Sequence, residues 1–105
     1  MLKHPKFKED LDKLEGLIVI DFYATWCGPC KTLGPILSQV KAELQEEIKI
    51  IKIDVDKNPS IAAQYQVKGV PTLIAFKKGQ NVWRQSGVLQ KDVIIGQIKA
   101  AGRSV

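Results

Sequence analysis

The chain has 105 residues, a mass of 11.7 kDa and a composition that is 45% hydrophobic and 26% charged. This length suits one domain, 1–105, with an ordinary core, and the composition excludes disordered, collagen-like and disulfide-scaffold chains. The longest unbroken apolar run has four residues, Leu17–Ile20. A helix needs about 20 such residues to cross a bilayer, so we expect no membrane span.

The chain is basic, with 16 Lys and Arg against 11 Asp and Glu and a net charge of +5. A basic chain can bind nucleic acid. Here, however, the positive residues are scattered, only two are arginines, and they form no basic block. We therefore expect no nucleic-acid partner, and the charge favours solubility or weak steering of acidic partners.

Cysteine and histidine are scarce, with Cys27, Cys30 and His4 as the only examples. A structural zinc ion usually needs more ligands than these three, so we expect no metal site unless a second chain contributes. Residues 1–15 are charged and lack the apolar core and cleavage site of a secretory signal. If the sequence is complete, this predicts a cytoplasmic location.

The first half of the chain alternates between helical and strand patterns. Residues 5–15 carry apolar side chains at helical spacing, and Gly16 is expected to end this helix. The nearly continuous apolar run 17–24 indicates a strand covered on both faces. Residues 27–47 form the next predicted helix, and the Ile-rich stretch 48–55 forms a second buried strand. The predicted buried stripe of the long helix is Leu33, Ile36, Leu37, Val40 and Leu44.

The second half predicts a short helix, a hairpin and a last helix. Asn58 is expected to cap a helix that opens with Pro59 and runs to about Gln66. Strands over 72–77 and 81–86 are joined by a glycine-containing turn. The last helix covers 89–101, with its inward side chains expected to be Leu89, Val93 and Ile98. The first two strands should be parallel and the hairpin antiparallel, giving a mixed α/β sheet between helices.

Both cysteines lie between the first strand and the start of the long helix. A thiolate at a helix N-terminus faces unpaired N–H groups and the positive end of the dipole, which favours ionisation. Cys27 is better placed for this than Cys30, which lies one turn inside and is expected to be more buried. A structural staple is the alternative, but a bridge closing so short a loop contributes only roughly 2 kcal/mol. The pattern Cys-x-x-Cys beside a β-α-β unit is typical of redox chemistry.

Several motifs together resemble the thioredoxin family. Asp21–Lys31 is similar to the active-site segment, Gly69–Thr72 to the cis-proline motif and Lys77–Gly79 to the hairpin turn. Three further motifs match in order and spacing: Asp54–Asp56, Asn58-Pro59 and Gly87. The resemblance implies the thioredoxin fold, a central mixed sheet of four to five strands flanked by helices.

The departures from the family lie mainly at the edges. Only Met1–His4 remain for the strand that usually precedes the first helix, so this strand is expected to be short or absent. Tyr23 stands where the family often has a second tryptophan. Trp83 is outside the family motifs, and we expect it to pack in the core or on the hairpin.

The resemblance implies a reaction in which Cys27 attacks a substrate disulfide and Cys30 resolves the mixed disulfide. Gly28 and Pro29 would stiffen the turn between them and, in the family, favour a reducing dithiol. Asp21 would be a buried acid/base that helps deprotonate Cys30, directly or through water. A solvated Asp21 at a sheet edge is the alternative.

Lys52 and the substrate surface are further expectations. Lys52 either reaches inward to pair with Asp21 or stays exposed with its stem on the sheet. Val70, before a cis Pro71, would pair with an extended substrate. A flat apolar docking surface would be completed by Trp26, Gly69 and Gly87, although core packing is the alternative for Trp26.

The main hypothesis is therefore a general protein-disulfide reductant, acting as a monomer without a bound metal or organic cofactor. By family analogy, a separate NADPH-dependent flavoprotein reductase would recycle the oxidised form. Two alternatives remain. An oxidase or isomerase of exported proteins is disfavoured by Gly28-Pro29 and by the missing signal. A binding subunit with incidental cysteines is disfavoured by the intact Cys27, Cys30 and Asp21.

Overall fold

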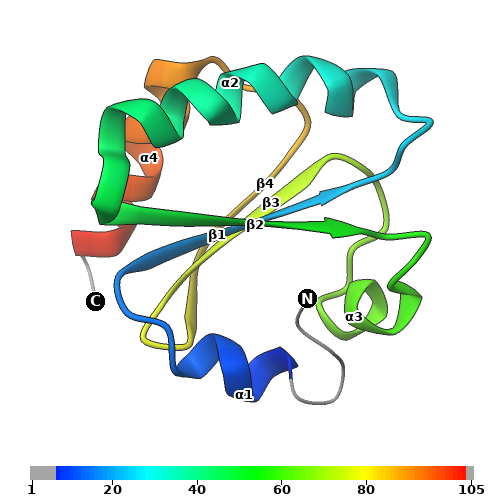
Figure 1. The fold of residues 1–105 in the computed structure, drawn as a ribbon, viewed down its shortest axis with the longest axis horizontal. Coiled ribbons are helices and arrows are strands. Elements are labelled where there is room, and N and C mark those ends of the chain that lie inside the picture. Colours follow the sequence, from blue (N-terminus) through cyan, green and yellow to red (C-terminus); the bar gives the residue numbers. More distant parts are fainter. Residues whose placement is uncertain (1–6, 104–105) are drawn as a thin grey trace.

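The computed structural model describes residues 7–103 and shows a mixed four-stranded sheet between two layers of helices (Figure 1). No helix among these residues is long and apolar enough to cross a membrane. The expectation that the N-terminal strand at Met1–His4 is short or absent concerns residues outside the described part of the chain. The elements in order are α1 (Phe7–Asp12), β1 (Leu17–Tyr23), α2 (Gly28–Leu44), the 3₁₀ turn η1 (Gln45–Glu47), β2 (Ile48–Asp54), α3 (Pro59–Gln64), β3 (Thr72–Lys77), β4 (Gln80–Ser86) and α4 (Lys91–Arg103).

The strands lie in the order β2-β1-β3-β4. The pairing of β1 with β2 is parallel, whereas β1–β3 and β3–β4 are antiparallel. This confirms the predicted β-α-β unit followed by a hairpin. It also makes β1 an interior strand with a helical layer on each face, which explains its nearly continuous apolar sequence.

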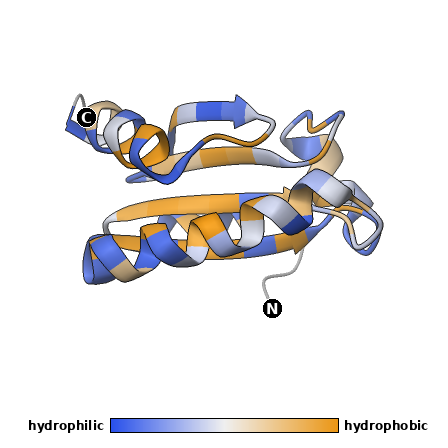
Figure 2. Ribbon diagram, turned by 90° about the horizontal axis from the view of Figure 1, so that it is seen from above, coloured by the Kyte–Doolittle hydropathy of each residue, from blue (hydrophilic) through white to orange (hydrophobic). Residues whose placement is uncertain are grey.

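Two apolar clusters fill the space between the sheet and the helices. Helices α2 and α4 cover one face, and α1 and α3 cover the other (Figure 1). Ile18, Ile20 and Phe22 pack toward α1 and α3, while Val19 packs toward α2 and α4. Because side chains alternate along a strand, Asp21 lies on the same face as Val19, toward α2. Figure 2 shows hydrophobic residues gathered along the inner strands of the sheet, whereas the helices in front of it carry both hydrophobic and hydrophilic residues.

The predicted helix stripes are confirmed in α2 and partly wrong in α4. In α2 the predicted residues are buried, except that Ile36 is partly buried against the same cluster. In α4, Val93 is 41% exposed, whereas Ile94, Ile95 and Ile98 are buried. The helix begins at Lys91, so Leu89 packs against the core from the preceding loop and does not define which face of the helix is buried.

Asn58 occupies the predicted position before α3 but does not cap the helix with its side chain. Its Nδ2 instead donates a hydrogen bond of 3.0 Å to the carbonyl oxygen of Asp54. The side chain therefore closes the turn after β2. The first-turn Pro59 begins the helix as predicted, although α3 ends at Gln64.

Candidate active site

The chain between β1 and α2 places the two cysteines one helical turn apart. Cys27 is the N-cap of α2, and its Sγ accepts a hydrogen bond of 3.1 Å from the backbone N–H of Cys30. Pro29 lies in the first turn of the helix, where no intrahelical N–H donor is required. Cys27 and Cys30 form a disulfide with a Cα–Cα distance of 5.3 Å. The structure therefore represents the oxidised form of the pair.

Both sulfur-bearing residues are buried, with Cys27 3% and Cys30 8% exposed. The prediction that Cys30 is the more buried of the two is therefore wrong for this form. Cys30 borders an open hollow beside Asp21, and Cys27 does not line it. Both cysteines pack with Ala24, and Val70 lies against this small cluster.

Asp21 is 2% exposed, which excludes the alternative of a solvated carboxylate at a sheet edge. Burial raises the pKa of Asp21 to about 6, because the charged form loses its hydration, while the nearby Lys52 acts in the opposite direction. Within the described chain, Asp21 Oδ1 has no hydrogen-bond partner. Asp21 and Cys30 line one hollow of about 390 Å³. A buried carboxyl with a raised pKa thus lies on the Cys30 side of the disulfide.

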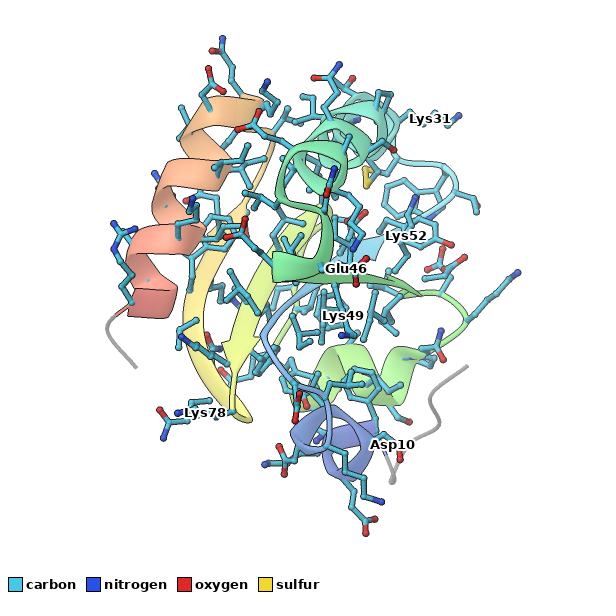
Figure 3. The ribbon with its side chains drawn as sticks, turned by 60° about the vertical axis from the view of Figure 1, so that its left-hand side comes forward. Asp10, Lys31, Glu46, Lys49, Lys52 and Lys78 are labelled. Atoms are coloured by element: carbon cyan, nitrogen blue, oxygen red, sulfur yellow. A yellow bond between two sulfur atoms is a disulfide. The ribbon has the colours of Figure 1, made fainter. Side chains whose placement is uncertain are left out.

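Lys52 is the register partner of Asp21 on the neighbouring strand β2. It is exposed, and among residues 7–103 it makes no ion pair within 4.0 Å, so of the two alternatives the exposed side chain is the one observed and the direct pairing with Asp21 is not formed. Its Nζ lies 5.1 Å from the centre of the Tyr23 ring. Figure 3 shows Lys31 extending outward from α2, whereas Lys52 lies closer to the body of the protein.

A second segment, Gly69–Pro71, lies beside the cysteines. The Val70–Pro71 peptide bond is cis, as the family resemblance implies. The N–H of Gly87 donates a hydrogen bond of 3.0 Å to the carbonyl oxygen of Pro71, which brings the end of β4 to the same place. This arrangement joins Val70 and Pro71, about forty positions from the cysteines in sequence, with Gly87, which is nearly sixty positions away.

Trp26 is 70% exposed, so the alternative of core packing is wrong. Its Nε1 donates a hydrogen bond of 2.8 Å to Asp56 Oδ2, which fixes the ring on the surface. A hollow of about 140 Å³ lies beside the ring. Its lining residues are Trp26, Val55, Val67, Lys68, Gly69 and Val70. Trp83 packs against the core as predicted, and its Nε1 donates to Gln97 Oε1.

Sequence reasoning did not assign roles to Asp56 or Tyr23. Asp56 follows β2, and its N–H donates a hydrogen bond of 2.9 Å to Asp54 Oδ1, which shapes the turn that presents it to Trp26. The feature of the sequence that could have indicated the contact of Asp56 with Trp26 is the predicted parallel pairing of the first two strands. The carboxyl ends of two adjacent parallel strands meet at one edge, so the residues after β1 and β2 must lie close together.

The chemistry of this site is that of a dithiol–disulfide oxidoreductase. A redox pair lies at a helix N-terminus, with an apolar surface on one side and a buried carboxyl on the other. No group of three or more His, Cys, Asp or Glu side chains in the described part of the chain could hold a metal ion.

Comparisons with known proteins agree with this class. The Thioredoxin family model matches residues 1–100, and the chain belongs to this family. It is 51% identical to a thioredoxin-like protein of Synechocystis over 82 residues, which cover 78% of each chain. It is 48% identical to a thioredoxin of Staphylococcus aureus over 77 residues, covering 73% of this chain and 74% of the relative.

A third relative is thioredoxin Y of rice, described as chloroplastic, which is 45% identical over 95 residues. That alignment covers 90% of this chain but only 56% of the rice protein. Family membership and the paired cysteines make the chain a dithiol reductant of protein disulfides. Proteins that carry disulfides are its substrates, and a reductase is its redox partner.

Proposed function

We propose that Cys27 is the attacking thiol and Cys30 the resolving thiol of this reductant. The Cys27 thiolate attacks one sulfur of a substrate disulfide, forming a mixed disulfide and releasing the other sulfur as a thiolate, which takes up a proton. Cys30 then loses its proton and attacks Cys27 Sγ. The second substrate thiolate leaves, so the substrate gains two electrons and the Cys27–Cys30 disulfide forms.

The observation that carries this assignment is the position of Cys27 at the N-cap of α2. Its sulfur accepts the Cys30 backbone N–H even in the disulfide. A thiolate at the same place would accept that hydrogen bond with a full charge and face the positive end of a 17-residue helix. Cys30 lies inside the first turn, where its thiolate would not receive this stabilisation.

Asp21 is proposed to accept the proton of Cys30. It lines the same hollow as Cys30, and with a pKa of about 6 it is largely ionised at neutral pH yet close enough in proton affinity to exchange a proton with a thiol. Its Oδ1, which has no hydrogen-bond partner among residues 7–103, can accept one. Lys52 is proposed to keep the charged form of Asp21 accessible through its positive charge.

The substrate surface is proposed to surround Cys27. The exposed Trp26 ring and the adjoining hollow give it an apolar floor, and the Val70 backbone would pair with an extended segment of the substrate. Gly87, held to Pro71 by its N–H, leaves room for that segment. The full proposed set is Trp26, Gly28, Pro29, Gly69, Val70, Pro71 and Gly87.

The partners and setting are proposed by family analogy. The electron donor is an NADPH-dependent flavoprotein reductase, and the chain acts as a single domain, 1–105, and as a monomer. A cytoplasmic location stays a prediction, because the relatives include a chloroplastic protein as well as bacterial ones.

Redox equilibration against glutathione tests the direction of the reaction. A general reductant should remain a dithiol only at a high ratio of reduced to oxidised glutathione. A pair that stays reduced in an oxidising mixture would contradict the proposal, because such a pair accepts electrons from its substrates. The Cys27→Ser and Cys30→Ser variants cannot form the Cys27–Cys30 disulfide, so they show which part of the measured redox change comes from this pair.

A further inference from the structure

The hollow beside Cys30 contains one contact that the proposed reaction does not use. Lys52 Nζ lies over the ring of Tyr23, 5.1 Å from its centre, within the range of a cation–π interaction. Tyr23 comes two residues after Asp21 on the same face of β1, and Lys52 is the β2 register partner of Asp21. The three side chains therefore form a triangle across two parallel strands.

The position of Lys52 needs a cause, because a lysine side chain in water is flexible. The described residues offer its ammonium no carboxylate within 4.0 Å. The Tyr23 ring is the one contact of its ammonium that the structure records among them. Tyr23 and Lys52 nevertheless line the same hollow as Asp21 and Cys30.

We propose that Tyr23 is a positioning residue whose ring holds the Lys52 ammonium at the mouth of the hollow and so tunes the proton affinity of Asp21. The effect on catalysis rests on the proposed role of Asp21 as base, whereas the hold of Tyr23 on Lys52 does not. Tyr23 is also the position where this chain departs from the tryptophan common in its family.

The charges around Asp21 indicate that the Tyr23 ring acts on Asp21 through Lys52. The ionisable groups that line its hollow are Lys52 from β2, Cys30 and Lys31 from α2, and Tyr23 from β1 itself. On β3 its register partner is the uncharged Leu73. Lys52 is the charge that lowers the pKa of Asp21 against the effect of burial. Releasing Lys52 into solvent should therefore raise that pKa further.

The experiment is an NMR titration of aspartate carboxyl carbons in the oxidised protein, where neither cysteine titrates. The Asp21 signal is identified by its absence from Asp21→Asn. Tyr23→Leu removes the ring, and Tyr23→Phe is the matched control that keeps it. An exposed cation–π contact shifts an equilibrium about two- to fivefold. Tyr23→Leu should therefore raise the Asp21 midpoint by a few tenths of a pH unit, with an upper limit of about 0.7. Tyr23→Phe should leave it near that of the unmodified protein.

A double-mutant cycle shows whether the ring acts through Lys52. Lys52→Met should raise the Asp21 midpoint at least as much as Tyr23→Leu, and adding Tyr23→Leu should then have no further effect. An unchanged midpoint in Tyr23→Leu would overturn the inference. So would a shift of equal size in Tyr23→Phe, or one that persists in full in the Lys52→Met background. Lys52→Met keeps the test informative if Tyr23→Leu fails to fold.

The reduced protein separates this inference from the proposed role of Asp21. If Tyr23→Leu moves the Asp21 midpoint, the pH profile of disulfide reduction should move by the same amount. A moved midpoint with an unmoved profile supports the positioning role of Tyr23 and contradicts the assignment of Asp21 as base.

Discussion

Replacing Asp21 by Asn should stabilise the protein at neutral pH while slowing its reaction. The folded protein raises the pKa of Asp21 from 3.8 to about 6, so between these values it binds more protons than the unfolded chain. The free energy of unfolding of the unmodified protein must then fall as the pH rises through this window. The shift of about two pH units corresponds to about 3 kcal/mol. Asp21→Asn removes this fall in the free energy of unfolding, because an amide does not titrate.

The stability gain should have a distinct pH dependence. The difference in unfolding free energy between Asp21→Asn and the unmodified protein should be smallest near pH 3.5, grow between about pH 4 and 6, and level off above. The plateau should fall somewhat below 3 kcal/mol, since the amide must also be desolvated. Urea denaturation of the oxidised proteins at closely spaced pH values measures it. Glu9→Gln, at an exposed carboxylate of α1, controls for the loss of one negative charge.

The kinetic half of the prediction concerns the proton of Cys30. Without the Asp21 carboxylate, resolution of the mixed disulfide should slow by roughly tenfold or more around neutral pH. Stopped-flow reduction of a protein disulfide from pH 6 to 9 measures this rate. An unchanged rate across that range would show that Asp21 is not the base. A large loss of stability at neutral pH would instead show that its charge has a structural partner.

The remaining predictions concern the cysteines and the tryptophan. In the reduced protein, Cys27 should be alkylated by brief iodoacetamide treatment much faster than Cys30, as mass spectrometry of the peptides would show, and equal labelling would reverse the roles proposed here. Cys30→Ser should accumulate a mixed disulfide through Cys27 on non-reducing gels, whereas Cys27→Ser should not. Trp26→Ala should weaken substrate binding, seen as a higher KM, with a change in unfolding free energy below about 1 kcal/mol because the ring is exposed. Asp56→Asn, which keeps a hydrogen-bond acceptor for Trp26, should raise KM less than Trp26→Ala does.

The sequence predicted most of the fold because its patterns have clear periods. The apolar run of β1 indicated a strand with helices on both faces, and the parallel and antiparallel pairings follow from the lengths of the connections. The buried Asp21 could be predicted for the same reason, since a polar residue inside such a run has nowhere else to go. Val93 was wrongly assigned to the buried face of the last helix, because a short apolar pattern does not define which face is buried until the first residue of the helix is known.

The parts of the site that escaped prediction depend on pairs of residues that only the sheet brings together. The pairing of β2 with β1 sets Lys52 over the Tyr23 ring, and the meeting of both strand ends sets Asp56 beside Trp26. No local pattern encodes these distances. The relative burial of Cys27 and Cys30 was also mispredicted, because depth along a helix says nothing about a hollow beside it.

The structure gives the two cysteines different surroundings although only two residues separate them. Cys27 caps the helix, where a negative sulfur is stabilised, and lies next to the apolar surface that we propose as the docking site. Cys30 borders a hollow that holds an acid with a raised pKa, the proposed acceptor of its proton. The same burial that raises the proton affinity of Asp21 costs the fold stability at neutral pH. The carboxyl therefore lowers the stability of the protein at the pH where its proposed role as a base requires the charged form, and Asp21→Asn would measure both effects.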